Sequence, residues 1–198
     1  MKKGYVVLVI MAVFLIIVVG MVLTYNGLVS AENRVDEAKA QVSVACQRRL
    51  DLIPNLVETV KGYAKHEKST ILAVTNARTR AQSVLSEFAA KQAVGNEEIS
   101  ALTTSQSELS GLLKDLLVVV EGYPDLKASA NFMALQDQLE GTESRIAVER
   151  MRYNAAVRSY NTKIRIFPGS IVAGMAGYMS REFIEESAEA KEPVEIEF

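Results

Sequence analysis

The sequence has one cysteine, one histidine and no tryptophan. Because Cys46 is alone, it can form neither an internal disulfide nor a CxxC metal site, so oxidising and reducing compartments both fit. The sequence also has no large excess of either positive or negative charge. The formal net charge is -2, with 22 Lys plus Arg against 24 Asp plus Glu, so no basic excess attracts nucleic acid. We therefore expect no nucleic-acid partner.

Residues that usually build a catalytic or metal site are scarce. His66 is the sole histidine, and we expect it on the surface at the start of a helix. Glu140 and Glu143 resemble carboxylates of di-iron bundles, but those bundles repeat a Glu-x-x-His motif on two helices. Neither a Gly-rich phosphate loop nor a G-x-S-x-G elbow occurs. We predict no enzymatic activity and no cofactor or metal.

Charge is absent from the first part of the chain. No charged residue occurs between Lys3 and Glu32, and residues 5–23 are apolar apart from Gly20. As a helix this run spans roughly 28 Å at about 1.5 Å per residue, close to the hydrocarbon thickness of about 30 Å. We predict one transmembrane anchor at residues 5–27, after a short basic segment at residues 1–4.

A cleaved signal peptide is the alternative for this run, because Val29-Ser30-Ala31 resembles a small-residue cleavage site. A signal core usually has about 7 to 15 apolar residues, so the longer run favours an anchor. Lys2 and Lys3 favour a cytoplasmic N-terminus, with the soluble domain on the other side. Counting Arg48 and Arg49 would reverse this orientation.

The remaining chain has helical periodicity. Pro54 and Pro124 are the only prolines between Ala31 and Phe167, and no β-branched run alternates in polarity. Near-heptad spacing, typical of coiled-coil packing, predicts four helical stretches. The first continues from the anchor to Val60 with a kink near Leu50, and the others span 66–88, 96–120 with Asn96 as cap, and 125–167. The two clearest apolar seams are Ile99, Leu102, Leu109, Leu113, Leu116 and Val120, broken by polar Gln106, and Phe132, Leu135, Leu139, Ile146, Tyr153, Tyr160 and Phe167.

Short connections between these helices favour an antiparallel bundle. The predicted fold class is all-α, with an N-terminal transmembrane helix that continues into a four-helix, mostly antiparallel bundle of long helices. Residues 28–167 would form the bundle domain. An apolar, Gly-rich segment at 168–180 and an acidic tail at 181–198 would follow it.

A polar cluster beside the first seam is the first candidate site. Arg48 and Asp51 are three residues apart, and Asp51 and Asn55 are four apart, so they share a helix face. The turn would bind an anion or lipid headgroup through forked guanidinium donors, or it would belong to an interhelical polar network that sets the register of the bundle. We favour the network. The candidate residues are Arg48, Arg49, Asp51, Asn55, Glu140 and Glu143.

The Gly-rich segment is the second candidate. We favour a flap that covers an exposed end of the bundle. The alternative is a segment that contacts the membrane or another copy, because Gly-x-x-Gly spacing allows close backbone approach. The candidate residues are Ile171, Val172, Gly174, Met175, Gly177 and Tyr178.

Four stretches resemble the LemA family of bacterial membrane proteins. They are TYNGLVSAENRV at 24–35, QRRLDLIPNLVETVKGYAKHEKSTILAVTNAR at 47–78, YPDLKASANFMALQDQLEGTESRIAVERMRYNAAVRSYN at 123–161 and IFPGSIVAGMAGY at 166–178. The resemblance covers almost the whole chain in collinear order. It implies an N-terminal anchor, a four-helix and mostly antiparallel bundle, no established reaction, and roles in the bacterial envelope and membrane organisation.

The resemblance and the periodicity together predict a single-pass protein of the bacterial cytoplasmic membrane. We expect a self-associating helical-bundle scaffold, involved in membrane organisation or envelope stress. Its expected partners are membrane lipid, further copies of itself and other envelope proteins. The alternative function is a membrane-tethered ligand-binding or sensory module that uses the turn from Arg48 to Asn55.

Overall fold

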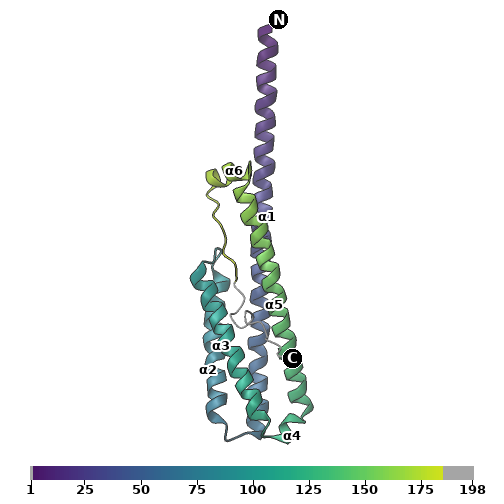
Figure 1. Cartoon of the computed structure of the whole chain (residues 1–198), viewed down its shortest axis with the longest axis vertical. Helices are drawn as coiled ribbons and strands as arrows, with labels where there is room; N and C mark the ends of the chain where they lie inside the picture. Colours follow the sequence, from purple (N-terminus) through teal and green to yellow (C-terminus); the bar gives the residue numbers. More distant parts are fainter. Residues whose placement is uncertain (1, 185–198) are drawn as a thin grey trace, which may run out of the picture. The chain divides into compact units, whose positions relative to one another are not determined.

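A computed structural model describes residues 2–184 of the chain. Within this range the secondary structure is helical without strands, so the predicted all-α class is confirmed. The helices are α1 (Lys2–Tyr63), α2 (Lys68–Ala90), α3 (Asn96–Val120), α4 (Pro124–Lys127), α5 (Ala130–Arg165) and α6 (Gly169–Ala176) (Figure 1). The predicted acidic tail lies outside the described residues from residue 185 onward.

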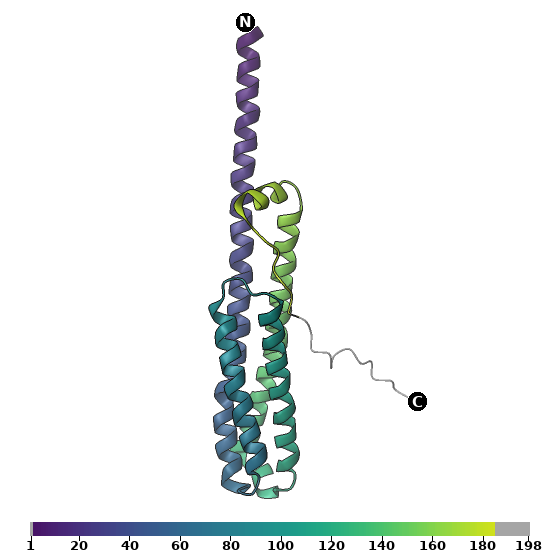
Figure 2. The same cartoon turned by 90° about the vertical axis from the view of Figure 1, so that its left-hand side faces the viewer.

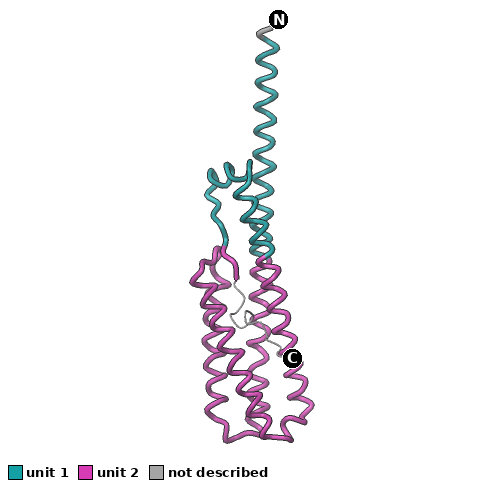
Figure 3. Tube along the Cα trace, in the orientation of Figure 1, with its two compact units in different colours: residues 1–37, 155–181 teal, residues 38–154, 182–198 magenta. Residues whose placement is uncertain are grey.

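The chain divides into two compact units (Figure 3). Unit 1 comprises residues 1–37 and 155–181, and unit 2 comprises residues 38–154 and 182–198, each as far as it is described. α1 and α5 each contribute to both units. The predicted limits of the bundle domain, residues 28 and 167, stay a prediction.

Unit 2 is a bundle in which parts of α1 and α5 lie side by side with α2 and α3 (Figures 1 and 2). The chain direction reverses from α1 to α2, from α2 to α3, and from α3 to α5 through α4 (Figures 1 and 2), as expected for antiparallel neighbours with short connections. The predicted α3 seam is correct, and its polar member Gln106 is buried with it. The α3 residues that pack inward include Ile99, Leu102, Gln106, Leu109, Leu113, Leu116 and Val120.

α1 passes through Pro54 without interruption. Proline has no backbone N–H, so Pro54 cannot donate to the carbonyl oxygen of Leu50, one helical turn earlier. That carbonyl accepts a hydrogen bond from Nε of Arg78 on α2, at 3.2 Å. An arginine from a neighbouring helix therefore satisfies the acceptor that the proline leaves open.

The start of α3 differs from the prediction by one residue. The N-cap is Gly95, and the expectation that Asn96 caps the helix is wrong. The Gly95 N–H donates to Oε2 of Glu98 at 2.8 Å, which satisfies one of the amides left open at a helix start. The side chain of Glu98 therefore closes this end of the helix.

The long C-terminal helix also differs at its ends. It was expected over 125–167, but Pro124–Lys127 form the short helix α4 and α5 begins only at Ala130. The Ala128 N–H donates to the Pro124 carbonyl at 2.9 Å, which closes a separate turn. α5 ends at Arg165 because Pro168 disfavours helical backbone just before it. Phe167 was expected in the buried seam, but its side chain is 79% exposed.

In unit 1, the side chains of the apolar run are exposed on all sides of α1. One long window of α1 is apolar enough to cross a membrane, and none of that window is buried inside the protein. Residues 4–19 are all exposed. Burial begins at Leu28, whose side chain is only 1% exposed. An exposed apolar cylinder of this length is stable in lipid and costly in water.

Candidate functional site

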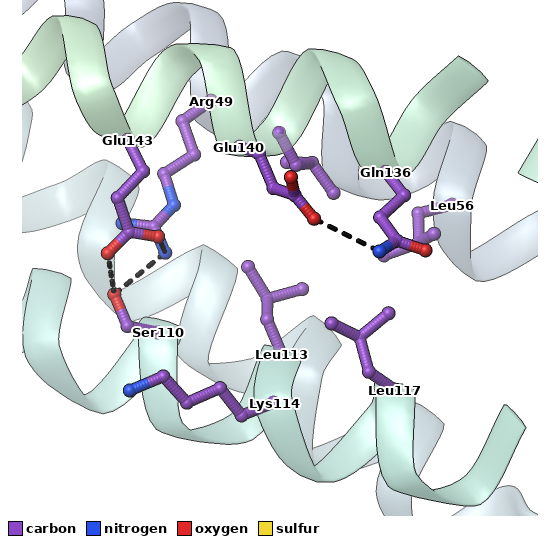
Figure 4. A pocket seen from close by; sticks show the side chains of 10 residues that line it. Arg49, Leu56, Ser110, Leu113, Lys114, Leu117, Gln136, Glu140 and Glu143 are labelled. Carbon is purple, nitrogen blue, oxygen red and sulfur yellow. Dashed lines mark hydrogen bonds and ion pairs between the residues drawn. The ribbon is translucent and has the colours of Figure 1, made fainter. Parts of the chain in front are cut away.

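A polar cavity of unit 2 opens between α1, α3 and α5. Its volume is about 160 Å³. Its lining residues are Arg49, Thr103, Gln106, Ser107, Ser110, Glu143, Ile146, Ala147 and Arg150. A smaller cavity of about 70 Å³ adjoins it through Arg49, Ser110 and Glu143 and also contacts Glu140 (Figure 4). Arg49 therefore lies where the two cavities meet.

The Arg49 guanidinium connects the three helices. Its side chain is 4% exposed, and its Nη2 donates to Oγ of Ser110 at 2.8 Å. The same nitrogen lies 3.6 Å from Oε2 of Glu143 on α5 (Figure 4). Ser110 Oγ also lies 3.0 Å from the Gln106 carbonyl, within its own helix. The structure thus brings together Arg49 and Glu143, two of the candidate residues, while the network that sets the register stays a prediction.

Burial lowers the pKa of Arg49, and the carboxylate of Glu143 opposes that shift. An arginine starts from a pKa so high that it keeps its proton at neutral pH. The Glu143 side chain is 60% exposed, so its charge is largely hydrated. The cavity therefore contains a fixed positive charge that a solvated carboxylate only partly balances.

The cavity wall also contains polar atoms that lack a partner. Gln106 is 2% exposed, and neither its Nε2 nor its Oε1 makes a hydrogen bond to any residue in 2–184. Nε of Arg150 likewise has no acceptor among those residues. A buried amide without partners costs free energy, so water or a small polar molecule would be stabilised here. The wall offers it two donor nitrogens and one acceptor oxygen.

The predicted turn does not gather around this cavity. Arg48, Asp51 and Asn55 are exposed, on the outer side of α1. Oδ1 of Asp51 accepts a hydrogen bond from Gln47 at 2.8 Å, and the Asn55 carbonyl accepts one from Thr59 at 2.8 Å. Arg49 points inward because it lies on the buried face of α1, whereas Arg48, Asp51 and Asn55 lie on the exposed face.

Glu140 and Glu143 occupy different positions relative to Arg49. Glu143 contacts Arg49, whereas Oε1 of Glu140 accepts from Nε2 of Gln136 at 3.0 Å, one turn away on α5 (Figure 4). Gln106 was visible in the sequence as the one polar residue in a seam. Nothing in the pattern singled out Ser110 or Arg150.

Metal chemistry finds no support in the described part of the chain. Among residues 2–184 no group of three His, Cys, Asp or Glu side chains could hold an ion. Burial raises the pKa of the Cys46 thiol to about 11, so it is a thiol rather than a reactive thiolate at neutral pH. Cys46 is fully buried and fills space in the core.

The second candidate site, the Gly-rich segment, forms α6 and the turn after it. Val172 and Ala173 are buried against Leu28 of α1. Gly177 ends the helix in the left-handed region with φ 77°, which a side chain would disfavour. The Tyr178 ring packs between those of Tyr25 and Tyr160, with centroids 6.3 and 6.5 Å away. Ile171, Gly174 and Met175 are exposed.

The chain after α6 is bound by a Tyr-Asn pair that recurs in α5 and that helical periodicity does not indicate. In unit 1, the Tyr160 hydroxyl donates to the Met179 carbonyl at 2.9 Å, and the Asn161 side chain exchanges two hydrogen bonds with the Arg181 backbone. In unit 2, Tyr153 and Asn154 make the same kinds of bond to Glu182 and Ile184. In the sequence this repeat is visible as the pair Tyr153-Asn154, which recurs seven residues later as Tyr160-Asn161.

A model of the LemA family matches residues 38–198. The chain belongs to the LemA family. Magnetosome proteins MamQ 1 and MamQ 2 of Paramagnetospirillum magneticum are each 26% identical to this LemA-family chain over 188 residues, 88% of the chain and 69% of the relative. Protein LemA of Metamycoplasma hominis is 23% identical over 148 residues, 75% of the chain and 63% of the relative.

Membership in the LemA family agrees with the exposed apolar helix. Together they identify a membrane-associated helical protein. The names of the family and of these relatives specify no catalysed reaction.

Proposed function

We propose that this LemA-family protein is a membrane-anchored scaffold of the bacterial envelope that self-associates and takes part in membrane organisation. The observation that carries the proposal is the continuity of α1. The same helix contains the exposed apolar run and the buried seam of the bundle, from Lys2 to Tyr63. A helix without a break between these parts suits a protein that holds a bundle at a membrane surface.

The interior of the bundle supports a structural role. Two arginines join helices to one another there: Arg49 contacts Ser110 and Glu143, and Arg78 donates to the Leu50 carbonyl. The magnetosome proteins among the relatives are named for a cellular structure rather than a reaction. That naming fits an organising role for the present chain.

Outward-facing apolar residues support self-association. Val44 on α1 is 62% exposed and Met151 on α5 is 58% exposed. Both point away from the buried seams of their helices. A second copy would remove them from water, and methionine is enriched where proteins meet.

The test is the mass of the full chain in detergent and in lipid nanodiscs, measured by light scattering over a range of concentrations. We expect a discrete assembly in both media. A double variant, Val44→Glu with Met151→Glu, should reduce it, whereas Ser144→Glu at an exposed polar position of α5 should not. A monomer at every concentration would contradict the scaffold proposal.

The polar cavity favours a second candidate, a membrane-tethered module that binds a small anionic ligand. Arg49 and Arg150 supply positive charge, and Gln106 presents a buried donor and acceptor with no partner among the described residues. A carboxylate would suit both arginines.

Thermal unfolding with and without acetate, as a simple carboxylate, tests this candidate. Acetate should raise the melting temperature of the native protein but not that of Gln106→Leu. If Gln106→Leu is instead more stable and acetate has no effect on either protein, then Gln106 is only an unpaired polar group in a hydrated cavity. The candidate would then be wrong.

A further inference from the structure

Helix α6 packs on α1 just beyond the apolar run. Its buried residues, Val172 and Ala173, contact Leu28, and all three belong to unit 1. The apolar run ends at Leu23. At about 1.5 Å per residue, the helix advances about 7.5 Å from Leu23 to Leu28. A headgroup layer is about 5 to 8 Å thick, so α6 is level with this layer if the run fills the hydrocarbon.

Charged groups in unit 1 define the limit of the hydrocarbon independently. Nζ of Lys163 lies 3.3 Å from the Gly27 carbonyl, and the Arg181 guanidinium lies 2.7 Å from the Glu32 carboxylate. Such groups are excluded from the hydrocarbon by the cost of dehydration. Tyr25, 46% exposed, has the position of an interfacial aromatic. The boundary therefore falls between Leu23 and Gly27.

The face of α6 that points away from α1 is apolar. Ile171 and Met175 are one helical turn apart, opposite Val172 and Ala173, and are 47% and 79% exposed. Phe167 before the helix and Met179 after it are each 79% exposed. No charged residue occurs between Arg165 and Arg181. A water-facing helix would not be expected to lack charge over this length.

The direction of α6 is consistent with a helix in the plane of a membrane surface. In Figures 1 and 2 it runs across α1 rather than along it. A backbone constraint maintains its approach to α5: a Cβ on Gly169 would lie 2.0 Å from the Lys163 carbonyl oxygen. Only glycine allows the chain to turn back this closely.

We propose that α6 and the residues on either side of it lie in the membrane interface, with Phe167, Ile171, Met175 and Met179 in contact with lipid. The inference deepens the proposed anchoring and rests on α1 spanning the bilayer. Lipid is the occupant that the structure favours, because this face lies beside the end of the exposed apolar run within one unit. A face covered by a second copy of the chain would not need to lie at the level of the lipid headgroups.

Fluorescence of the full chain in phosphatidylcholine vesicles tests the proposal. Single cysteines in a Cys46→Ala background, Ile171→Cys and Met175→Cys, would carry an environment-sensitive dye. Separate vesicles would contain lipid with a spin label near the headgroup or near the acyl-chain end. We expect blue-shifted emission from both positions. The shallow label should quench this emission at least about twofold more strongly than it quenches a dye at a Ser159→Cys control.

Ser159 is the matched control because it is exposed on α5 in the same unit, before the segment that contacts α6. A Val13→Cys variant reports the anchor separately and should be quenched best by the deep label. If Val13 is quenched but Ile171 and Met175 emit as in water, the α6 proposal is overturned and the anchor stands. Blue-shifted emission without lipid quenching overturns it in favour of a second copy. If the deep label does not quench the dye at Val13, the anchor proposal itself is overturned.

Discussion

Asn161 and Arg181 exchange two hydrogen bonds. Nδ2 of Asn161 donates to the Arg181 carbonyl at 2.8 Å, and Oδ1 accepts from the Arg181 N–H at 2.9 Å. An asparagine side chain thus pairs with the backbone N–H and C=O of one residue, as a neighbouring strand would. The Arg181 side chain binds Glu32 of α1, so this pairing also fixes an ion pair within unit 1. The chain after α6 is held by helix side chains rather than by secondary structure of its own.

Asn161→Ala should release the backbone at residue 181. Two part-buried hydrogen bonds are lost, with an expected cost of about 1–2 kcal/mol in the opening of this segment. Hydrogen exchange at the Arg181 amide, measured by mass spectrometry, should become faster by about 5- to 30-fold, the factor that corresponds to this cost. Thr162→Ala is the control, because its hydroxyl bonds only the Arg158 carbonyl of its own helix. Equal exchange in both variants would show that the pairing is not formed.

Arg78→Met should destabilise the bundle by about 1–2 kcal/mol, because the Leu50 carbonyl would lose its donor. The effect should depend on Pro54. In a Pro54→Ala background the new backbone N–H can bond the Leu50 carbonyl, so Arg78→Met should cost at least about 0.5 kcal/mol less. Denaturant unfolding of the four proteins in the double-mutant cycle gives the coupling. Strictly additive effects would contradict the assigned role of Arg78.

Arg49→Ala should lower the melting temperature. Removing one partner of a fully buried ion pair commonly costs about 3–5 kcal/mol, but Glu143 is 60% exposed and can be hydrated alone. We therefore expect about 1–3 kcal/mol, mainly from the lost Ser110 hydrogen bond and lost packing. Arg48→Ala, at the exposed neighbouring position, should change stability by no more than about 0.5 kcal/mol. Unchanged stability of Arg49→Ala would leave ligand binding as the better role for this residue.

Cys46 should resist alkylation in the folded protein. Its pKa rises from 9.0 to about 11 by burial, so at about pH 8 its thiolate fraction is about a hundredfold below that of the unfolded chain. Maleimide labelling, followed by mass spectrometry, should be slow until denaturant is added. Rapid labelling of the native protein would disprove burial of this thiol.

The same shift predicts how stability depends on pH. The unfolded chain releases the Cys46 proton near pH 9 and the folded protein only near 11. The thiol therefore contributes stability below about pH 9, and that contribution is lost as pH rises toward about 11. A Cys46→Ala variant should show a weaker decrease over this interval in urea unfolding. An identical decrease in both proteins would assign it to other groups.

Gly169→Ala and Gly174→Ala form a matched pair in α6. A Cβ at Gly169 would meet the Lys163 carbonyl oxygen at 2.0 Å, whereas nothing lies within 4 Å of a Cβ at Gly174. The first change should displace α6 from α5, at a cost of about 1–3 kcal/mol, and the second should be neutral or slightly stabilising. Exchange of the Tyr178 amide, which bonds the Ala173 carbonyl at 3.0 Å, reports the difference. Similar exchange in both variants would contradict the close approach.

The sequence alone determined the helical class, the apolar run of α1 and the α3 seam, because all three depend only on which residue types recur along the chain. It also identified Gln106 as the polar exception in that seam. The tertiary structure decided which polar residues meet. Residues next to each other in sequence point in different directions on a helix, so Arg49 is buried while Arg48, Asp51 and Asn55 are exposed. Arg78 donates to the Leu50 carbonyl that Pro54, more than twenty residues before Arg78, leaves without a donor. Local spacing contains no information about such partners on other helices.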